Sequence, residues 1–65
     1  MDNFDALADE VANLEQRVSD AIFDAVRAQM RNEDAPAAAL LEKRLSKVRR
    51  SLRKAEMLLR GADDD

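Results

Sequence analysis

The chain has 65 residues and a formal net charge of −3, with one Gly, one Pro, and neither Cys nor His. Without cysteine and histidine it lacks the residues for a disulfide framework and for the thiolate and imidazole ligands of most transition-metal sites, so we expect no metal and no cofactor. Ala, Leu, Glu, Lys and Arg dominate the composition, which favours an all-α fold of a single domain. A chain this short buries only about 60% of the surface that its unfolded form exposes.

The first predicted helix runs from about residue 4 to about residue 32. Its apolar residues recur at intervals of three and four, which places them in one stripe along the helix: Phe4, Leu7, Val11, Leu14, Val18, Ala21 and Ala25. We expect Asp2 or Asn3 to cap the start of this helix. Arg27 and Arg31 suit its C-terminal end, where the helix dipole favours positive charge.

A turn is predicted at residues 33–35, and a second helix from about residue 35 to about residue 60. Asp34 is a good N-cap residue, and Pro36 fits only the first turn of a helix. Gly61 is expected to end the helix in the left-handed conformation. The apolar stripe of this helix has heptad spacing: Leu41, Leu45, Val48, Leu52, Ala55 and Leu59. Residues 1–62 therefore read as one hairpin, followed by an acidic tail at residues 63–65.

The predicted fold is all-α, an antiparallel two-helix hairpin that dimerises into a four-helix bundle of the coiled-coil type. The residues expected in the core are Leu7, Val11, Leu14, Val18, Ile22, Leu41, Leu45, Val48, Leu52 and Leu59. Five further apolar residues fall outside the two stripes and need a second partner, so we predict that they form the oligomer interface: Phe23, Val26, Met30, Leu40 and Leu58. A homodimer is the favoured assembly.

The charges divide between the two halves of the chain. Residues 1–34 hold nine Asp or Glu and three Arg, whereas residues 35–62 hold two Glu and eight Lys or Arg. In the second half, a basic ridge faces away from the apolar stripe: Lys43, Lys47, Arg50 and Lys54. The favoured interpretation is a solvated face that pairs with acidic side chains of a neighbouring helix. Binding to a nucleic-acid phosphate backbone, or to an acidic protein or membrane surface, stays open as an alternative.

The acidic residues of the first half have the complementary interpretation. Asp2, Asp9, Asp20 and Asp24 are expected to face outward, either solvated or paired with the basic ridge of another subunit. No loop in the sequence offers the convergent carboxylates that a Ca²⁺ or Mg²⁺ site requires.

The sequence does not indicate an enzyme. Ser19, Ser46 and Ser51 lack a histidine to activate them, and a two-helix hairpin offers no pocket in which paired carboxylates could act. No apolar run approaches the roughly 20 residues of a membrane-spanning helix. The acidic segment Met1-Asp2-Asn3-Phe4-Asp5 is unlike a signal peptide, so we expect a cytoplasmic location.

One segment resembles a known family. Lys47-Val48-Arg49-Arg50-Ser51-Leu52-Arg53-Lys54-Ala55 is similar to the second helix of ribosomal protein twenty-nine of the large subunit, and Val26-Arg27-Ala28-Gln29 is similar to a stretch of its first helix. That family is also a helical hairpin. The resemblance implies contacts of Arg49, Arg50 and Arg53 with ribosomal RNA. The chain departs from the family in Arg53, where alanine is usual, in the longer spacing between the two segments, and in its acidic first half.

The function expected from these observations is that of a small non-enzymatic helical-hairpin protein acting through self-association and protein–protein interaction. The alternative is an RNA- or DNA-phosphate-binding protein that uses the basic ridge of the second helix, for example a ribosome-associated hairpin. Steep salt dependence of nucleic-acid binding distinguishes the two, because an apolar interface hardly responds to salt.

Overall fold

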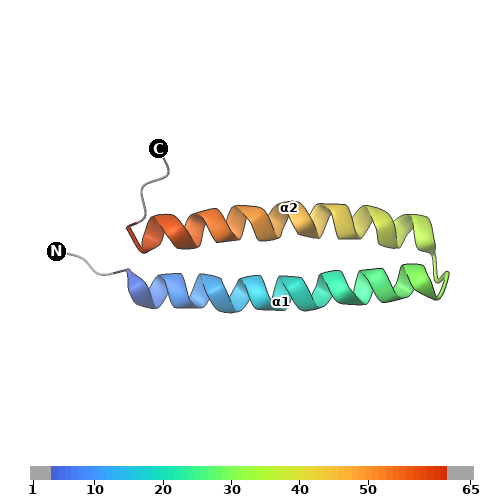
Figure 1. Ribbon diagram of the computed structural model, residues 1–65, viewed down its shortest axis with the longest axis horizontal. Coiled ribbons are helices and arrows are strands. Elements are labelled where there is room, and N and C mark those ends of the chain that lie inside the picture. Colours follow the sequence, from blue (N-terminus) through green and yellow to red (C-terminus); the bar gives the residue numbers. More distant parts are fainter. Residues whose placement is uncertain (1–3, 62–65) are drawn as a thin grey trace.

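The computed structural model describes residues 4–61 and consists of two α-helices, α1 (Asp5–Met30) and α2 (Ala35–Leu59). The helices run antiparallel, side by side along their whole length, and are joined by one short turn (Figure 1). The all-helical fold and the packing of the two helices against each other confirm the predicted hairpin. The acidic tail at residues 63–65 and the predicted capping residues Asp2 and Asn3 lie outside the described residues.

Helix α1 ends two residues earlier than expected because of the conformation of Asn32. This residue has a φ of 60°, in the left-handed region where asparagine is among the few tolerated side chains. The backbone N–H of Asn32 donates to the carbonyl of Gln29, and that of Glu33 donates to the carbonyl of Ala28. These two bonds form a Schellman motif, in which Asn32 takes the place that glycine usually occupies.

The start and the end of helix α2 follow the sequence signals closely. Asp34 occupies the N-cap position of α2, as predicted. It has a φ of 47°, however, and its carboxylate forms no capping hydrogen bond within the described structure. Pro36 lies in the first turn of α2, as its missing N–H requires. Gly61 has a φ of 88°, which confirms the predicted left-handed residue after the helix.

The contact between the helices is narrow and consists mainly of small residues. The buried apolar residues are Ala8, Ile22 and Ala25 on α1 and Ala38 on α2. Alanine side chains let two helix backbones approach closely, but they cover little apolar surface. The molecule measures 51 × 23 × 11 Å, and residues 4–61 form a single layer of two helices lying side by side (Figure 1).

The predicted core was therefore correct only in part. Ile22 is buried, and five of its expected neighbours are half-buried: Val11, Val18, Leu45, Leu52 and Leu59. Leu7, Leu14, Leu41 and Val48 were expected to be buried, yet each is more than 40% exposed. The physical reason is that two helices meet along one line, so side chains beside that line are covered from one direction only.

Candidate interaction surfaces

The sides of the hairpin follow from the residues that lie between the helices. On α1, the residues that face α2 recur at seven-residue intervals and are buried or half-buried: Ala8, Glu15, Ile22 and Gln29. Residues three positions after them lie on one side of this line, and residues four positions after them lie on the other. The hairpin therefore presents two different long sides.

One side is a polar seam in which side chains of α1 contact side chains of α2 at several levels between the two ends of the hairpin. Four contacts form this seam: Asp9 with Arg60, Glu15 with Arg53, Ser19 with Arg49, and Gln29 with Glu42. The shortest is the bond from Gln29 Nε2 to Glu42 Oε1, at 2.7 Å. The longest joins Arg53 Nε and Glu15 Oε1, at 3.7 Å. Together these contacts align the two helices in one antiparallel register.

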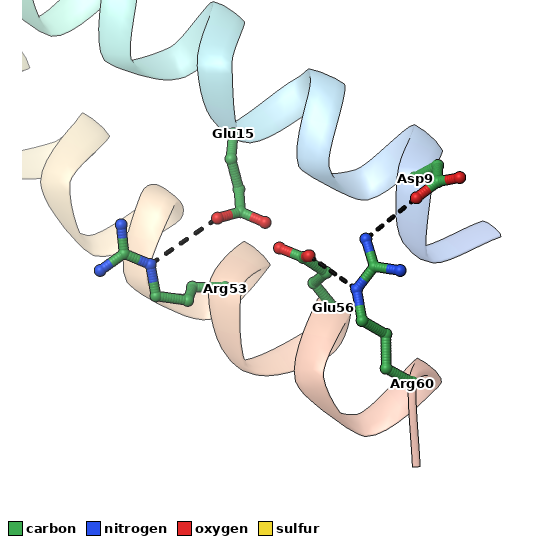
Figure 2. Close-up of polar contacts among 5 residues, drawn as sticks. All are labelled: Asp9, Glu15, Arg53, Glu56 and Arg60. Carbon is green, nitrogen blue, oxygen red and sulfur yellow. Dashed lines mark hydrogen bonds and ion pairs between the residues drawn. The ribbon is translucent and has the colours of Figure 1, made fainter. Parts of the chain in front are cut away.

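Two carboxylates meet in this seam, those of Glu15 and Glu56 (Figure 2). The side chain of Glu15 is only 13% exposed, and its Oε2 is buried without a hydrogen-bond partner. The pKa of Glu15 is raised, first because a proton on Glu15 can be donated to Glu56, and then because of burial and repulsion by Glu56. The pKa of Glu56 is lowered by the hydrogen bonds that it accepts from protonated Glu15 and from Arg60.

At the end of the seam far from the turn, Arg60 forms hydrogen bonds with both helices (Figure 2). Its Nη2 donates to Asp9 Oδ1 at 3.0 Å, and its Nε donates to Glu56 Oε2 at 2.9 Å. The two carboxylates raise the pKa of the guanidinium further, the hydrogen bond to Glu56 contributing most. Asp9 thus pairs within its own hairpin, whereas the sequence predicted solvation or pairing with another subunit.

The seam was not predicted from the sequence, because its residues are charged, amide or hydroxyl side chains at positions flanked by apolar stripes. A signal for it is present in the chain. Glu42, Arg49 and Glu56 follow one another at seven-residue intervals, each four positions after a residue of the inter-helix line, namely Ala38, Leu45 and Leu52. Such spacing places all three on one edge of α2, facing α1.

The opposite long side is an apolar face. It carries Phe4 directly before α1, Leu7, Val11, Leu14 and Val18 on α1, and Leu41, Val48 and Ala55 on α2. The exposed fractions of its large side chains are 46% for Phe4, 47% for Leu7 and 48% for Leu41. Val48, Leu52 and Ala55 also line a shallow hollow of about 470 Å³ on this face.

The five residues predicted as the oligomer interface do not lie on one surface. Phe23, Met30 and Val26 lie on the side of the polar seam, because Phe23 and Met30 follow Asp9 at multiples of seven residues and Val26 follows Ser19 at seven. Leu40 and Leu58 lie at the edge of the apolar face. Phe23, Met30, Leu40 and Leu58 are each more than half exposed. As an interface, this set stays a prediction.

The basic ridge lies on the outer surface of α2, away from α1. All four residues of the ridge are exposed: Lys43, Lys47, Arg50 and Lys54. Three of them, Lys43, Lys47 and Arg50, line a shallow hollow of about 430 Å³ together with Ser46 and Leu40. On α1, Asp20 and Asp24 are exposed; Asp24 pairs with Arg27 of its own helix at 3.4 Å. The predicted acidic residue Asp2 lies outside the described range.

Among residues 4–61, no group of three or more Asp or Glu side chains lies close enough together to hold a metal ion. Neither described helix is long and apolar enough to cross a membrane. The chain matches no family model, no curated protein and no solved structure. The resemblance of residues 47–55 to the ribosomal hairpin is therefore not accompanied by a match to that family over the chain.

Proposed function

We propose that this protein is a small, non-enzymatic interaction module that acts by associating with a second copy of itself and through that assembly with other proteins. The observation that carries the proposal is the exposed apolar surface. Among residues 4–61, ten large hydrophobic side chains are at least 42% exposed, whereas one large hydrophobic side chain, Ile22, is buried. Contiguous exposed apolar surface on a small chain is typical of an interaction site.

Several of these side chains lie together on one face and are not scattered over the surface, and this supports association. Leu7, Leu14, Leu41 and Val48 share one face that runs along both helices, and heptad spacing keeps them aligned. Packing one such face on another converts two helical layers into a four-helix bundle with a continuous core. In the bundle each half-exposed side chain gains cover from the direction that the single hairpin leaves open.

The test is the dependence of mass and helicity on concentration. Sedimentation equilibrium from low to high micromolar concentration should show conversion to a dimer, and circular dichroism over the same range should show a parallel rise in helicity. Both signals should be little affected by raising the salt from 0.1 to 0.5 M, because apolar contacts dominate. A folded monomer at high micromolar concentration would contradict the proposal.

A phosphate-binding function is the second candidate, supported by the exposure of Lys43, Lys47 and Arg50 along the outer surface of α2. The described structure contains no Trp or Tyr, and neither Phe lies in the ridge for base stacking. A gel shift with mixed RNA and duplex DNA at low salt tests this candidate. Binding through the ridge should weaken steeply with salt and weaken further in the Lys47→Gln/Arg50→Gln variant.

A further inference from the structure

The apolar face has a shape and a charge pattern that indicate what covers it. Near the turn, α1 contributes small side chains to this face, Ala21 and Ala28, while α2 contributes the larger Leu41 and Val48. Farther from the turn the order reverses over most of the helix, because α1 contributes Leu7 and Leu14 while α2 contributes small residues, Ser51 and Ala55, before the larger Leu58 at its end. A face on which large and small side chains alternate between helices is complementary to another copy of itself.

We propose that the apolar face is covered by the apolar face of a second copy, in a two-fold dimer whose two turns lie at the same end. In this arrangement α1 of each copy packs antiparallel against α2 of the other. The inference rests on the proposed self-association and adds the surface and the geometry. The alternative two-fold dimer has its turns at opposite ends, with α1 on α1 and α2 on α2.

The side chains at the edges of the apolar face distinguish these two arrangements. The contacts of Ser19 with Arg49 and of Asp9 with Arg60 fix which levels of the two helices correspond. By that register Asp24 lies level with Arg44 and Lys47. When the turns lie at the same end, α1 meets α2 of the second copy at this same level. Asp24 of each copy then faces Arg44 and Lys47 of the other.

The same-end arrangement also places like charges together, Arg17 of each copy with Lys54 of the other, beside these opposite charges. The opposite-end arrangement is less favourable at every edge. It sets the basic outer edges of two α2 helices against each other, with Lys47 and Lys54 in both copies. It also brings Arg17, which lies at the middle of α1, close to Arg17 of the second copy. Like charges placed side by side oppose an arrangement, so charge favours turns at the same end.

The polar seam is consistent with this dimer because it stays on the outer side of each hairpin. Its contacts hold Asp9, Ser19 and Gln29 to α2 of the same copy, so these side chains keep their partners when the apolar faces meet. Burying the side of the polar seam instead would require the removal of charged groups such as Arg53 and Arg60 from water.

A spin-label distance measurement tests the arrangement. The natural chain has no cysteine, so Glu33→Cys introduces a single label position at the exposed turn. With the turns at the same end, the two labels of a dimer should lie less than about 25 Å apart. With the turns at opposite ends, they should be separated by about the length of α1, which is on the order of 40 Å for 26 residues.

Asp20→Cys is the matched control, because this exposed position lies near the middle of α1 and gives a short distance in both arrangements. Dipolar coupling at position 20 together with a short distance at position 33 supports the proposal. Coupling at position 20 together with a long distance at position 33 overturns the arrangement but leaves self-association intact. Absence of coupling at both positions, with a monomer in sedimentation, overturns the proposed function as well. Persistence of the dimer in Leu14→Asp would show that another surface mediates it.

Discussion

The two long sides of the hairpin differ in how far a single copy satisfies them. On the polar seam, Asp9, Ser19 and Gln29 each find a partner on α2 within the same chain. On the apolar face, Leu7 and Leu14 stay nearly half exposed, because a two-helix layer offers them no partner above. The two sides therefore have different roles in the molecule. Polar contacts define how the chain folds back on itself, and the apolar surface is left exposed. In the proposed dimer this surface would contribute most of the stabilising free energy of association.

The largest effect is expected from the variant Leu14→Asp/Val48→Asp, which replaces two residues of the apolar face. Each buried Leu or Val contributes about 1.5–3 kcal/mol, and a dimer contains four of these side chains. The dissociation constant should therefore rise by more than about 1,000-fold, and helicity should fall with it. Sedimentation equilibrium and circular dichroism at matched concentrations measure both effects.

The matched control is Phe23→Asp/Met30→Asp, which changes two exposed apolar residues on the side of the polar seam. The dimer should persist in this variant, with its dissociation constant changed by less than about tenfold. The reverse result, a monomer for the control and a dimer for Leu14→Asp/Val48→Asp, would show that the sequence-based interface near the turn is the correct one.

A smaller effect is expected from a variant that tests how closely the two helices pack. Ala8 is completely buried between them, whereas Ala6 is exposed on the same helix. Ala8→Leu should destabilise the hairpin by about 1–3 kcal/mol, because three further carbon atoms do not fit without moving α2. Ala6→Leu is the control and should change the free energy of unfolding by less than about 0.5 kcal/mol. Urea denaturation at fixed protein concentration checks the difference; equal effects would mean that Ala8 has room.

The smallest expected effect is at the carboxylate pair in the polar seam. Because the folded-state pKa of Glu15 is raised, this group contributes stability below its ordinary value of 4.5 and loses that contribution as pH rises through the folded pKa. Glu56 behaves oppositely, since its lowered pKa contributes stability above 4.5 that is lost as pH falls further. Between pH 7 and pH 4.5, protonation of Glu15 should therefore stabilise the protein.

Glu15→Gln isolates this contribution, because the amide donates a hydrogen bond to Glu56 at every pH and removes the repulsion between the two carboxylates. The variant should be more stable than the natural protein at pH 7 by about 0.5–1.5 kcal/mol, and the difference should shrink towards pH 4.5. Denaturant titrations at both pH values measure it. Glu10→Gln, an exposed carboxylate on the same helix, is the control for a general change of charge. A variant less stable than the natural protein at pH 7 would show that the contact of Glu15 with Arg53 matters more than the repulsion.

Much of the fold could be predicted from the chain because its signals are local. Heptad stripes define two helices, Pro36 starts the second of them, and Gly61 follows its end with a positive φ. The end of α1 was harder to place, since asparagine only sometimes adopts the left-handed conformation that Asn32 has in the turn. The candidate surfaces were predicted less well. The basic ridge lies where periodicity places it, but the interface residues predicted from the sequence are divided between the two long sides of the hairpin.

The sequence by itself determined that this chain forms two amphipathic helices and folds back close to residues 33–35, because capping, proline chemistry and periodicity act over a few residues; in the structure the turn spans residues 31–34. Only the tertiary structure decided which edge of each stripe faces the other helix. Glu15 and Ile22 occupy the same line on α1, and nothing local separates a charged from an apolar residue there. Their surroundings are fixed by the rotation of α1 against α2, which the contacts along the polar seam hold in one register. That rotation turns Glu15 toward Glu56 and leaves Leu14 half open to solvent.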